Sequence, residues 1–270
     1  MASKRSKADT KTKQRDNHNL NTLKRHKTSK TAIDANDCQL SPKSRQISPY
    51  FQSIDRLCYQ FFATKTCIQL SKALLGQTLC RRLSPEGPIL KAMIVETEAY
   101  MGVIDKSCHT YGGRRTKCNE AMFMSSATIY VYKIHGIYHC LNLSAEEEGA
   151  VVLLRAVEPL EGIDSMNQLR TQFQRRRRQT SSDDNRVEKP YKPKMLANGP
   201  SKLCIAFDIT KDNMNKVDIT NSSLIWIERS AAVCAEDIVC SKRIGISGDQ
   251  EWVDKEFRFY IKGSDFVSKK

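Results

Sequence analysis

The chain contains no apolar run long enough to cross a bilayer and no hydrophobic signal-peptide core near its N-terminus. We therefore expect a soluble, intracellular protein. C-x-x-C pairs are also absent, and long, irregular gaps separate most of the ten cysteines. This spacing argues against a zinc site or a disulfide framework, so we expect no metal. Four cysteines lie within apolar patterns and are predicted to be reduced core residues: Cys67, Cys80, Cys140 and Cys204.

Acidic residues are fewer than basic ones: the chain has 30 Asp and Glu but 44 Lys and Arg, which gives a net charge of +14. Residues 1–45 hold twelve of the basic residues and only four Asp. Such a surface attracts a polyanion, although a basic tail is often only a solubilising arm. Because residues 1–46 almost lack aromatic residues, we predict a disordered basic arm. Lys4-Arg5 and the cluster at 24–27 could serve for nuclear localisation, or equally for weak contacts with nucleic acid.

The composition becomes globular near Tyr50, and residues 47–270 are expected to form one domain. We predict an α+β fold with a mostly antiparallel, curved sheet and flanking helices. The patterns favour helices at 68–75 and 160–173, a helix starting near 202, and strands at 78–83, 89–99, 128–133, 150–157, 224–228 and 257–262. Residues 102–127 are expected to form a loop. Residues 174–194, with Arg175–Arg178, are predicted to be a mobile charged insertion.

Two carboxylates, Glu96 and Glu98, lie one residue apart at the end of the predicted strand 89–99. Side chains alternate along a strand, so both should point to the same face. A carboxylate at a strand end, next to an aromatic residue, suits general-base chemistry. A solvent-exposed glutamate is the simpler interpretation of either residue taken alone.

The residues that follow Glu98 favour a functional site. They include rings, basic side chains and an amide near strand ends or in loops: Tyr100, His109, Arg114, Tyr130, Tyr132, His135, Asn142 and Arg155. Rings beside a carboxylate suit a pocket that sandwiches a flat base, and stacking contributes about 1–3 kcal/mol per base. Together with the basic charge, they suggest an enzyme that flips a nucleotide out of a duplex.

Several motifs occur in an order and spacing that resembles the 3-methyladenine (alkyladenine, or methylpurine) DNA glycosylase family. They are VETEAYMG at 95–102, GRRT at 113–116, YVY at 130–132, LLRA at 153–156, GPSKL at 199–203, RIGI at 243–246 and RFYIKGS at 258–264. The resemblance covers roughly residues 60–268. The N-terminal arm and the 174–194 segment lie outside it.

The resemblance implies a role for each matched residue. Glu98 would be the general base that deprotonates the attacking water, which Arg155 and the backbone carbonyl of Ile244 would hold. Tyr100, His109 and Tyr132 would stack on the extruded base, and Asn142 would screen against the exocyclic amine of guanine. His135 would intercalate into the DNA. Contacts with the DNA backbone would come from Arg114, Thr116 and Lys202.

The resemblance further implies a monofunctional enzyme, since no lysine nucleophile is matched. No metal or organic cofactor is implied. The partner would be double-stranded DNA containing damaged purines, and we expect a monomer located in the nucleus. Breaking a purine N-glycosidic bond builds positive charge on the sugar. One carboxylate can both stabilise that charge and activate water.

The chain departs from the family pattern at the predicted wedge, where His135 replaces a tyrosine. A smaller, more polar imidazole fills less of the base stack. Ser126-Ala127 replaces Pro-Gly, and Cys118 replaces an arginine. These departures leave open a catalytically weak lesion-binding protein that recruits repair partners. A hydrolase or transferase acting on RNA or nucleotides is a further alternative.

Simpler interpretations also exist for single residues. Glu96 is expected to be structural, and Arg155 could be its buried ion-pair partner. His109 could be an ordinary loop histidine. For Tyr130 we favour core packing, on the face of its strand opposite to Tyr132.

Overall fold

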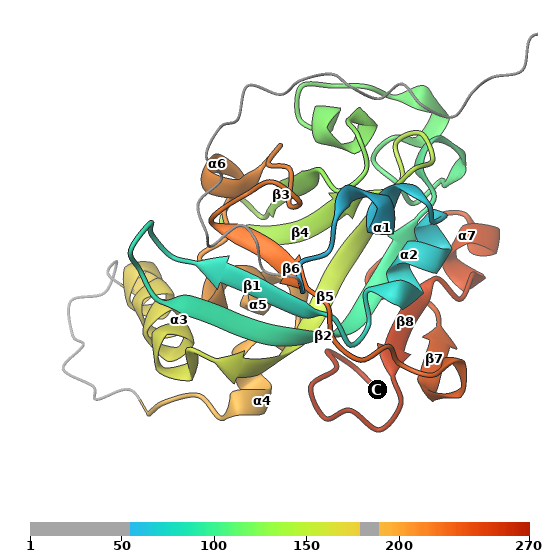
Figure 1. Ribbon diagram of the computed structural model, residues 1–270. Coiled ribbons are helices and arrows are strands. Elements are labelled where there is room, and N and C mark those ends of the chain that lie inside the picture. Colours follow the sequence, from blue (N-terminus) through green and yellow to red (C-terminus); the bar gives the residue numbers. More distant parts are fainter. Residues whose placement is uncertain (1–54, 179–188) are drawn as a thin grey trace, which may run out of the picture. The chain divides into compact units, whose positions relative to one another are not determined.

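The computed structural model describes residues 55–178 and 189–270. The predicted N-terminal arm, its two basic clusters and residues 179–188 of the predicted insertion lie outside the described residues. Within the described part, the chain forms the predicted α+β fold, in which helices pack on a curled antiparallel sheet (Figure 1).

Eight strands pair into this sheet within the described part of the chain. They are β1 (Thr78–Arg82), β2 (Ile89–Tyr100), β3 (Ile129–Ile134), β4 (Tyr138–Ser144), β5 (Val151–Glu161), β6 (Ile225–Glu228), β7 (Ile238–Ser241) and β8 (Arg258–Ile261). The main order is β3-β4-β5-β2-β1-β6, and β8 pairs with both β2 and β7. The sequence patterns missed β4 and β7. In β4 the polar residues Asn142 and Ser144 are buried and bonded to backbone, which hides the strand alternation.

The helices are α1 (Tyr59–Ala63), α2 (Cys67–Ala73), α3 (Ile163–Arg178), α4 (Pro193–Leu196), α5 (Pro200–Ala206), α6 (Lys211–Met214) and α7 (Gln250–Asp254). Short 3-10 turns, not a featureless loop, occupy much of 102–127. The four cysteines predicted to lie in the core are buried, as expected: Cys67, Cys80, Cys140 and Cys204.

Helix α3 continues to Arg178 and α4 begins at Pro193, so the prediction of a mobile insertion over 174–194 is wrong for residues 174–178 and 193–194. The packing of one face of α3 explains why the helix extends this far. Met166 and Arg170 are buried, and Phe173 and Arg177 contact Tyr138 of β4. Basic side chains in a last turn also interact favourably with the negative end of the helix dipole.

Strand β2 is the central element of the sheet and the one that places the carboxylates. One edge pairs with β5; on the other edge, the first half pairs with β1 and the second half with β8 (Figure 1). The pairing with β5 shifts register around Glu96, as at a β-bulge. Thr97 faces α2 and donates its hydroxyl proton to the carbonyl of Ser71. Glu96 and Glu98 share the opposite face, as predicted.

Candidate active site

Two carboxylates and one arginine form the centre of the site. Glu96 and Glu98 are fully buried on β2, and Arg155 reaches both from the neighbouring strand β5. Its Nε lies 3.4 Å from Glu96 Oε1, and its Nη1 lies 3.1 Å from Glu98 Oε2. Buried charges must be paired in this way, because the cost of removing them from water is several kcal/mol per ion.

Glu96 is tied to the scaffold by contacts from the C-terminal part of the chain. Its Oε1 lies 2.8 Å from Nη1 of Arg258. Ser268 donates its backbone N–H to Oε2 at 2.6 Å and its hydroxyl to Oε1 at 2.9 Å. Each oxygen of Glu96 is therefore occupied by structural partners, in line with the expectation that it is not the catalytic carboxylate.

Glu98 accepts hydrogen bonds from Ile244 and from Tyr100, which lines the pocket described below. The backbone N–H of Ile244 donates to Oε1 at 2.7 Å, and the hydroxyl of Tyr100 donates to Oε2 at 3.0 Å. Burial raises the pKa of Glu98, although Arg155, Ile244 and Tyr100 act in the opposite direction. A carboxylate with a raised pKa is a better proton acceptor than an exposed one. Burial and the nearby Glu98 charge raise the pKa of Tyr100, so its hydroxyl stays a donor.

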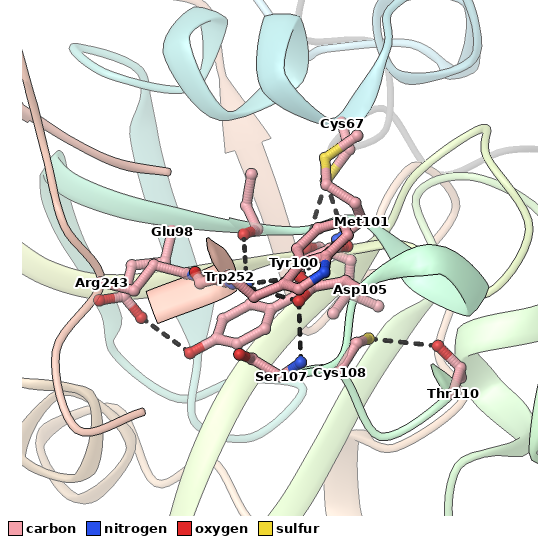
Figure 2. Close-up of polar contacts among 12 residues, drawn as sticks. Cys67, Glu98, Tyr100, Met101, Asp105, Ser107, Cys108, Thr110, Arg243 and Trp252 are labelled. Atoms are coloured by element: carbon pink, nitrogen blue, oxygen red, sulfur yellow. Dashed lines mark hydrogen bonds and ion pairs between the residues drawn. The ribbon is translucent and has the colours of Figure 1, made fainter. Parts of the chain in front are cut away.

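Arg243 supports Tyr100 from outside the pocket. Its guanidinium lies 4.7 Å from the Tyr100 ring centroid and makes a two-pronged ion pair with buried Asp105, at 2.5 and 3.1 Å. Asp105 also accepts from the backbone N–H groups of Met101 and Ser107 (Figure 2). This network fixes the chain that leaves β2. Sequence reasoning missed the pair, because 138 residues separate its members.

An aromatic pocket of about 390 Å³ opens beside Tyr100. Four neighbouring strands, two loops and one 3-10 turn supply its lining: Tyr100, Lys106, Ser107, Cys108, His109, Met122, Tyr130, Tyr132, Asn142, Val151, Gly245, Ile246 and Ser247. The volume is within the range of roughly 300–1,000 Å³ that is typical of ligand sites. Glu98 itself is not part of the lining and lies behind Tyr100. The structure thus brings together Tyr100, His109, Tyr132 and Asn142, as the resemblance implies.

Tyr130 is buried in a small core cluster, as expected, but it shares the pocket with Tyr132, so the expectation that they face opposite ways is wrong. Residues two apart on a strand point to the same face. Their rings stack with centroids 5.7 Å apart and planes at 25°. The Tyr130 hydroxyl lies 2.9 Å from Nδ1 of His109, and the His109 ring stands edge-on to Tyr132 at 4.8 Å. Burial and the charge of Arg114 lower the pKa of His109, so this ring is neutral near pH 7.

Asn142 is held rigidly on β4. Its Nδ2 donates to the carbonyls of Tyr130 at 3.1 Å and Cys140 at 3.3 Å. Both amide hydrogens are therefore used within the fold, and a ligand in the pocket meets an amide that cannot turn. Fixed polar groups of this kind give a pocket its selectivity.

A wider groove of about 910 Å³ runs from the pocket to the β3–β4 hairpin. It shares His109, Tyr130 and Tyr132 with the pocket and ends at His135. Its charged lining residues are all basic within the described part of the chain: Lys106, Arg114, Lys133 and Lys211. The groove is therefore suited to a polyanion.

His135 is exposed at the hairpin turn, where it has φ +49° and Gly136 has φ +73°. Two positive φ angles in a row are typical of a type I′ hairpin turn. Arg114 and Thr116 line the groove, although the Thr116 hydroxyl also donates to Asn119 at 3.0 Å. Lys202 lies apart on α5, donates to Asn198 at 2.8 Å and lines neither the pocket nor the groove.

One of the other departures from the family pattern lines the groove. Cys118 is an exposed part of its lining, so an arginine there would add a positive charge. Ala127 has φ +71°, a conformation that glycine adopts without strain but that costs other residues about 1–3 kcal/mol. The replacement of glycine by alanine therefore stores strain just before β3.

No group of three or more His, Cys, Asp or Glu side chains in residues 55–178 and 189–270 is arranged to hold a metal ion. Likewise, none of the helices in those ranges is long and apolar enough to span a membrane.

An aromatic pocket in front of a buried carboxylate, at the end of a basic groove, is the arrangement of an enzyme that acts on a flat base of a nucleic acid. The sequence model of the methylpurine-DNA glycosylase family matches residues 60–265. The chain therefore belongs to the methylpurine-DNA glycosylase family and is a DNA glycosylase.

Relatives with this activity in their names are similar over most of the chain. A probable DNA-3-methyladenine glycosylase of Encephalitozoon cuniculi is 48% identical over 202 residues, covering 75% of this chain and 88% of that protein. The human DNA-3-methyladenine glycosylase is 42% identical over 226 residues, with coverages of 82% and 72%. A putative 3-methyladenine DNA glycosylase of Clostridium perfringens is 43% identical over 212 residues, with coverages of 77% and 97%.

Proposed function

We propose that this DNA glycosylase excises alkylated or deaminated purines of the 3-methyladenine, 7-methylguanine and hypoxanthine type from double-stranded DNA. It hydrolyses the N-glycosidic bond with a water activated by Glu98, and so starts base excision repair in the nucleus. It acts as a monomer and without a lyase step. The observation that carries the proposal is the buried Glu98–Arg155 pair at 3.1 Å behind the wall of an aromatic pocket.

The chemistry needs one negative group near the sugar. As the bond to the purine breaks, positive charge develops on the sugar ring, and the Glu98 carboxylate stabilises it electrostatically. The same carboxylate takes a proton from the attacking water, which Arg155 and the Ile244 carbonyl orient. The raised pKa of Glu98 favours this proton transfer.

The attacking water has to gain access to Glu98. Oε2 accepts from Tyr100 and lies next to Arg155, whereas Oε1 accepts one hydrogen bond, from the Ile244 N–H. A carboxylate oxygen has two lone pairs, so Oε1 keeps one acceptor position for the water, beside Ile244. Catalytic contacts commonly form only once substrate is bound.

Recognition of the base depends on stacking and shape. Tyr100 covers one face of the extruded base, while His109 and Tyr132 contact the other. Purines such as 3-methyladenine carry a positive charge, which electron-rich tyrosine faces attract. Neutral hypoxanthine must rely on fit and on protonation as it leaves. The fixed amide of Asn142 crowds the exocyclic amine of guanine.

The direct experiment is an excision assay on duplexes that contain one 3-methyladenine or one hypoxanthine, run with a chelator. The released base and the intact abasic strand are both measured. We expect release of the base, no strand cleavage and no effect of the chelator. An absence of base release at saturating protein would overturn the proposal.

A catalytically weak lesion-binding protein is the second candidate. It is favoured by His135, which presents only an exposed imidazole at the hairpin turn. In the same assay this candidate predicts tight, lesion-dependent binding with negligible release of the base.

A further inference from the structure

The last turn of α3 carries four consecutive arginines and is docked on the hairpin that bears His135. Nη1 of Arg177 donates to the hydroxyl of Tyr138 at 2.7 Å, and its guanidinium lies 5.6 Å from the centroid of the Tyr138 ring. Phe173 packs on the same ring, with centroids 5.8 Å apart. Tyr138 pairs with Ile134 directly beside the hairpin turn. The arginine run is thus fixed next to the predicted DNA wedge.

The charge of this turn exceeds what the helix itself requires. A helix C-terminus carries about half a negative charge, which one cation balances. Arg175 and Arg176 are exposed, and neither has an ion pair or hydrogen bond within the part of the chain that the structure describes. A cavity beside this turn has one acidic residue, Asp208, among its described lining residues. The carboxylate of Asp208 lies 3.9 Å from the guanidinium of Arg81. Adjacent like charges of this kind are stabilised by an external anion.

A cavity of about 620 Å³ lies between this turn and the hairpin. Arg176 and Arg177 line it on the helix side, and Lys133 and Gly136 line it on the hairpin side. Lys133 also lines the groove that contains His135. A single exposed lysine therefore joins two basic surfaces, one on each side of the hairpin.

We propose that Arg176 and Lys133 form a second phosphate-binding surface, which the exposed Arg175 extends along α3 and which holds the backbone of duplex DNA on the side of the hairpin away from the base pocket. The proposal rests on the proposed function for the position of His135 at the lesion. Duplex DNA is the occupant because the surface is basic and continuous with the groove. Guanidinium groups also suit phosphate oxygens, which they bind in pairs of hydrogen bonds.

Binding of the DNA backbone on this side would also hold the hairpin in place, because Arg177 of the same helix turn is bonded to Tyr138. The enzyme would thereby compensate for a wedge residue that fills little of the base stack.

The test uses the full chain and the double variant Arg175→Gln/Arg176→Gln, whose side chains are exposed and outside the base pocket. The matched control, Arg229→Gln/Lys262→Gln, removes two exposed positive charges that line neither the groove nor the cavity. The Kd is measured over a range of salt concentrations on a hypoxanthine duplex and on an undamaged duplex. Single-turnover excision is measured at saturating protein.

The double variant should bind both duplexes several-fold more weakly than the control variant. The slope of log K against log salt should fall by about one to two, because each phosphate contact contributes roughly 0.9. The excision rate at saturation should stay at the wild-type value. Affinity and slope equal to those of the control would overturn the proposal. Failure of the wild-type protein to excise the base would instead overturn the proposed function, independently of the binding result.

Duplexes shortened either 5′ or 3′ of the lesion test on which side of the lesion the arginines contact the DNA backbone. One of the two truncations should remove the difference in affinity between the double variant and the control, because it removes the phosphates that Arg175 and Arg176 contact. A difference that persists with both truncations would contradict a surface on one side of the hairpin.

Discussion

Tyr100 combines two roles in one side chain. Its ring forms a wall of the aromatic pocket, and its hydroxyl donates to Oε2 of Glu98 at 3.0 Å. Arg243 and Asp105 hold the ring from behind. Stacking of the base is therefore coupled to the hydrogen bonding of the proposed catalytic carboxylate.

The variant Tyr100→Phe separates these roles, since it keeps the ring and removes the hydroxyl. The hydroxyl stabilises the ionised form of Glu98 and so lowers its pKa; without it, the pKa should rise further. Because the general base must be ionised, the acid limb of the pH–rate profile should move to higher pH. The measurement is single-turnover excision across the pH range.

Tyr132→Phe is the matched control. It also removes a phenol hydroxyl from the pocket, but not one that is bonded to Glu98. Its acid limb should coincide with that of the wild type. An acid limb that shifts equally in both variants would contradict a specific role for the Tyr100 hydroxyl.

At the scale of single residues, the sequence was informative where a motif was local. Glu98 and Tyr100 lie two residues apart, and a strand period places both beside one face. Asp105 with Arg243, and Ser268 with Glu96, were not predicted, because folding joins positions 138 and 172 residues apart. The side chain of Tyr130 was predicted on the wrong face of its strand, although the two-residue period of a strand places it on the same face as Tyr132.

At the scale of elements, Glu96 connects β2 with β5, β8 and the C-terminal segment through Arg155, Arg258 and Ser268. Glu96→Gln should lower the free energy of unfolding by about 3 kcal/mol, because it leaves buried arginine charge without its partner. Urea unfolding measures this. Glu161→Gln, which removes the exposed partner of half-buried Lys91, should cost less than about 1 kcal/mol. An equal loss of unfolding free energy in the two variants would contradict a structural role for Glu96.

The β3–β4 hairpin offers a second test at this scale. His135→Tyr places a larger aromatic ring at the exposed turn, and we expect tighter binding of a single-lesion duplex and faster single-turnover excision, by up to about tenfold. Binding of an undamaged duplex should change little. If lesion binding and excision are unchanged or worse, His135 is not a weakened wedge.

Elements were predictable where their patterns were regular. Strands β1, β2, β3, β6 and β8 and helix α2 lie close to their predicted ranges, whereas β5 runs past its predicted end at 157 to Glu161, so the helix predicted from 160 begins only at Ile163. Strand β4 was missed because its polar residues are satisfied inside the fold. The end of α3 was missed because its stability depends on Arg177 and Phe173 packing on Tyr138, a contact that the local sequence does not reveal.

At the scale of the whole molecule, charge is the dominant property. Residues 1–45 hold twelve Lys and Arg against four Asp, so they carry +8 of the net +14. Deletion of residues 1–46 should weaken binding to any duplex at low salt, and less so at high salt, since the ions screen these charges. Excision at saturating protein should not change. A loss of that rate, or a deletion effect independent of salt, would contradict the interpretation of this segment as a basic arm.

The central claim is that Glu98 activates the attacking water, and Glu98→Gln tests it most directly. This variant keeps the size of the side chain but removes its charge and its ability to accept a proton. Single-turnover excision of hypoxanthine should fall by more than about 10³-fold, while binding of the same lesion duplex stays within a few-fold of wild type. Excision by Glu98→Gln at a rate near that of the wild type would contradict the account.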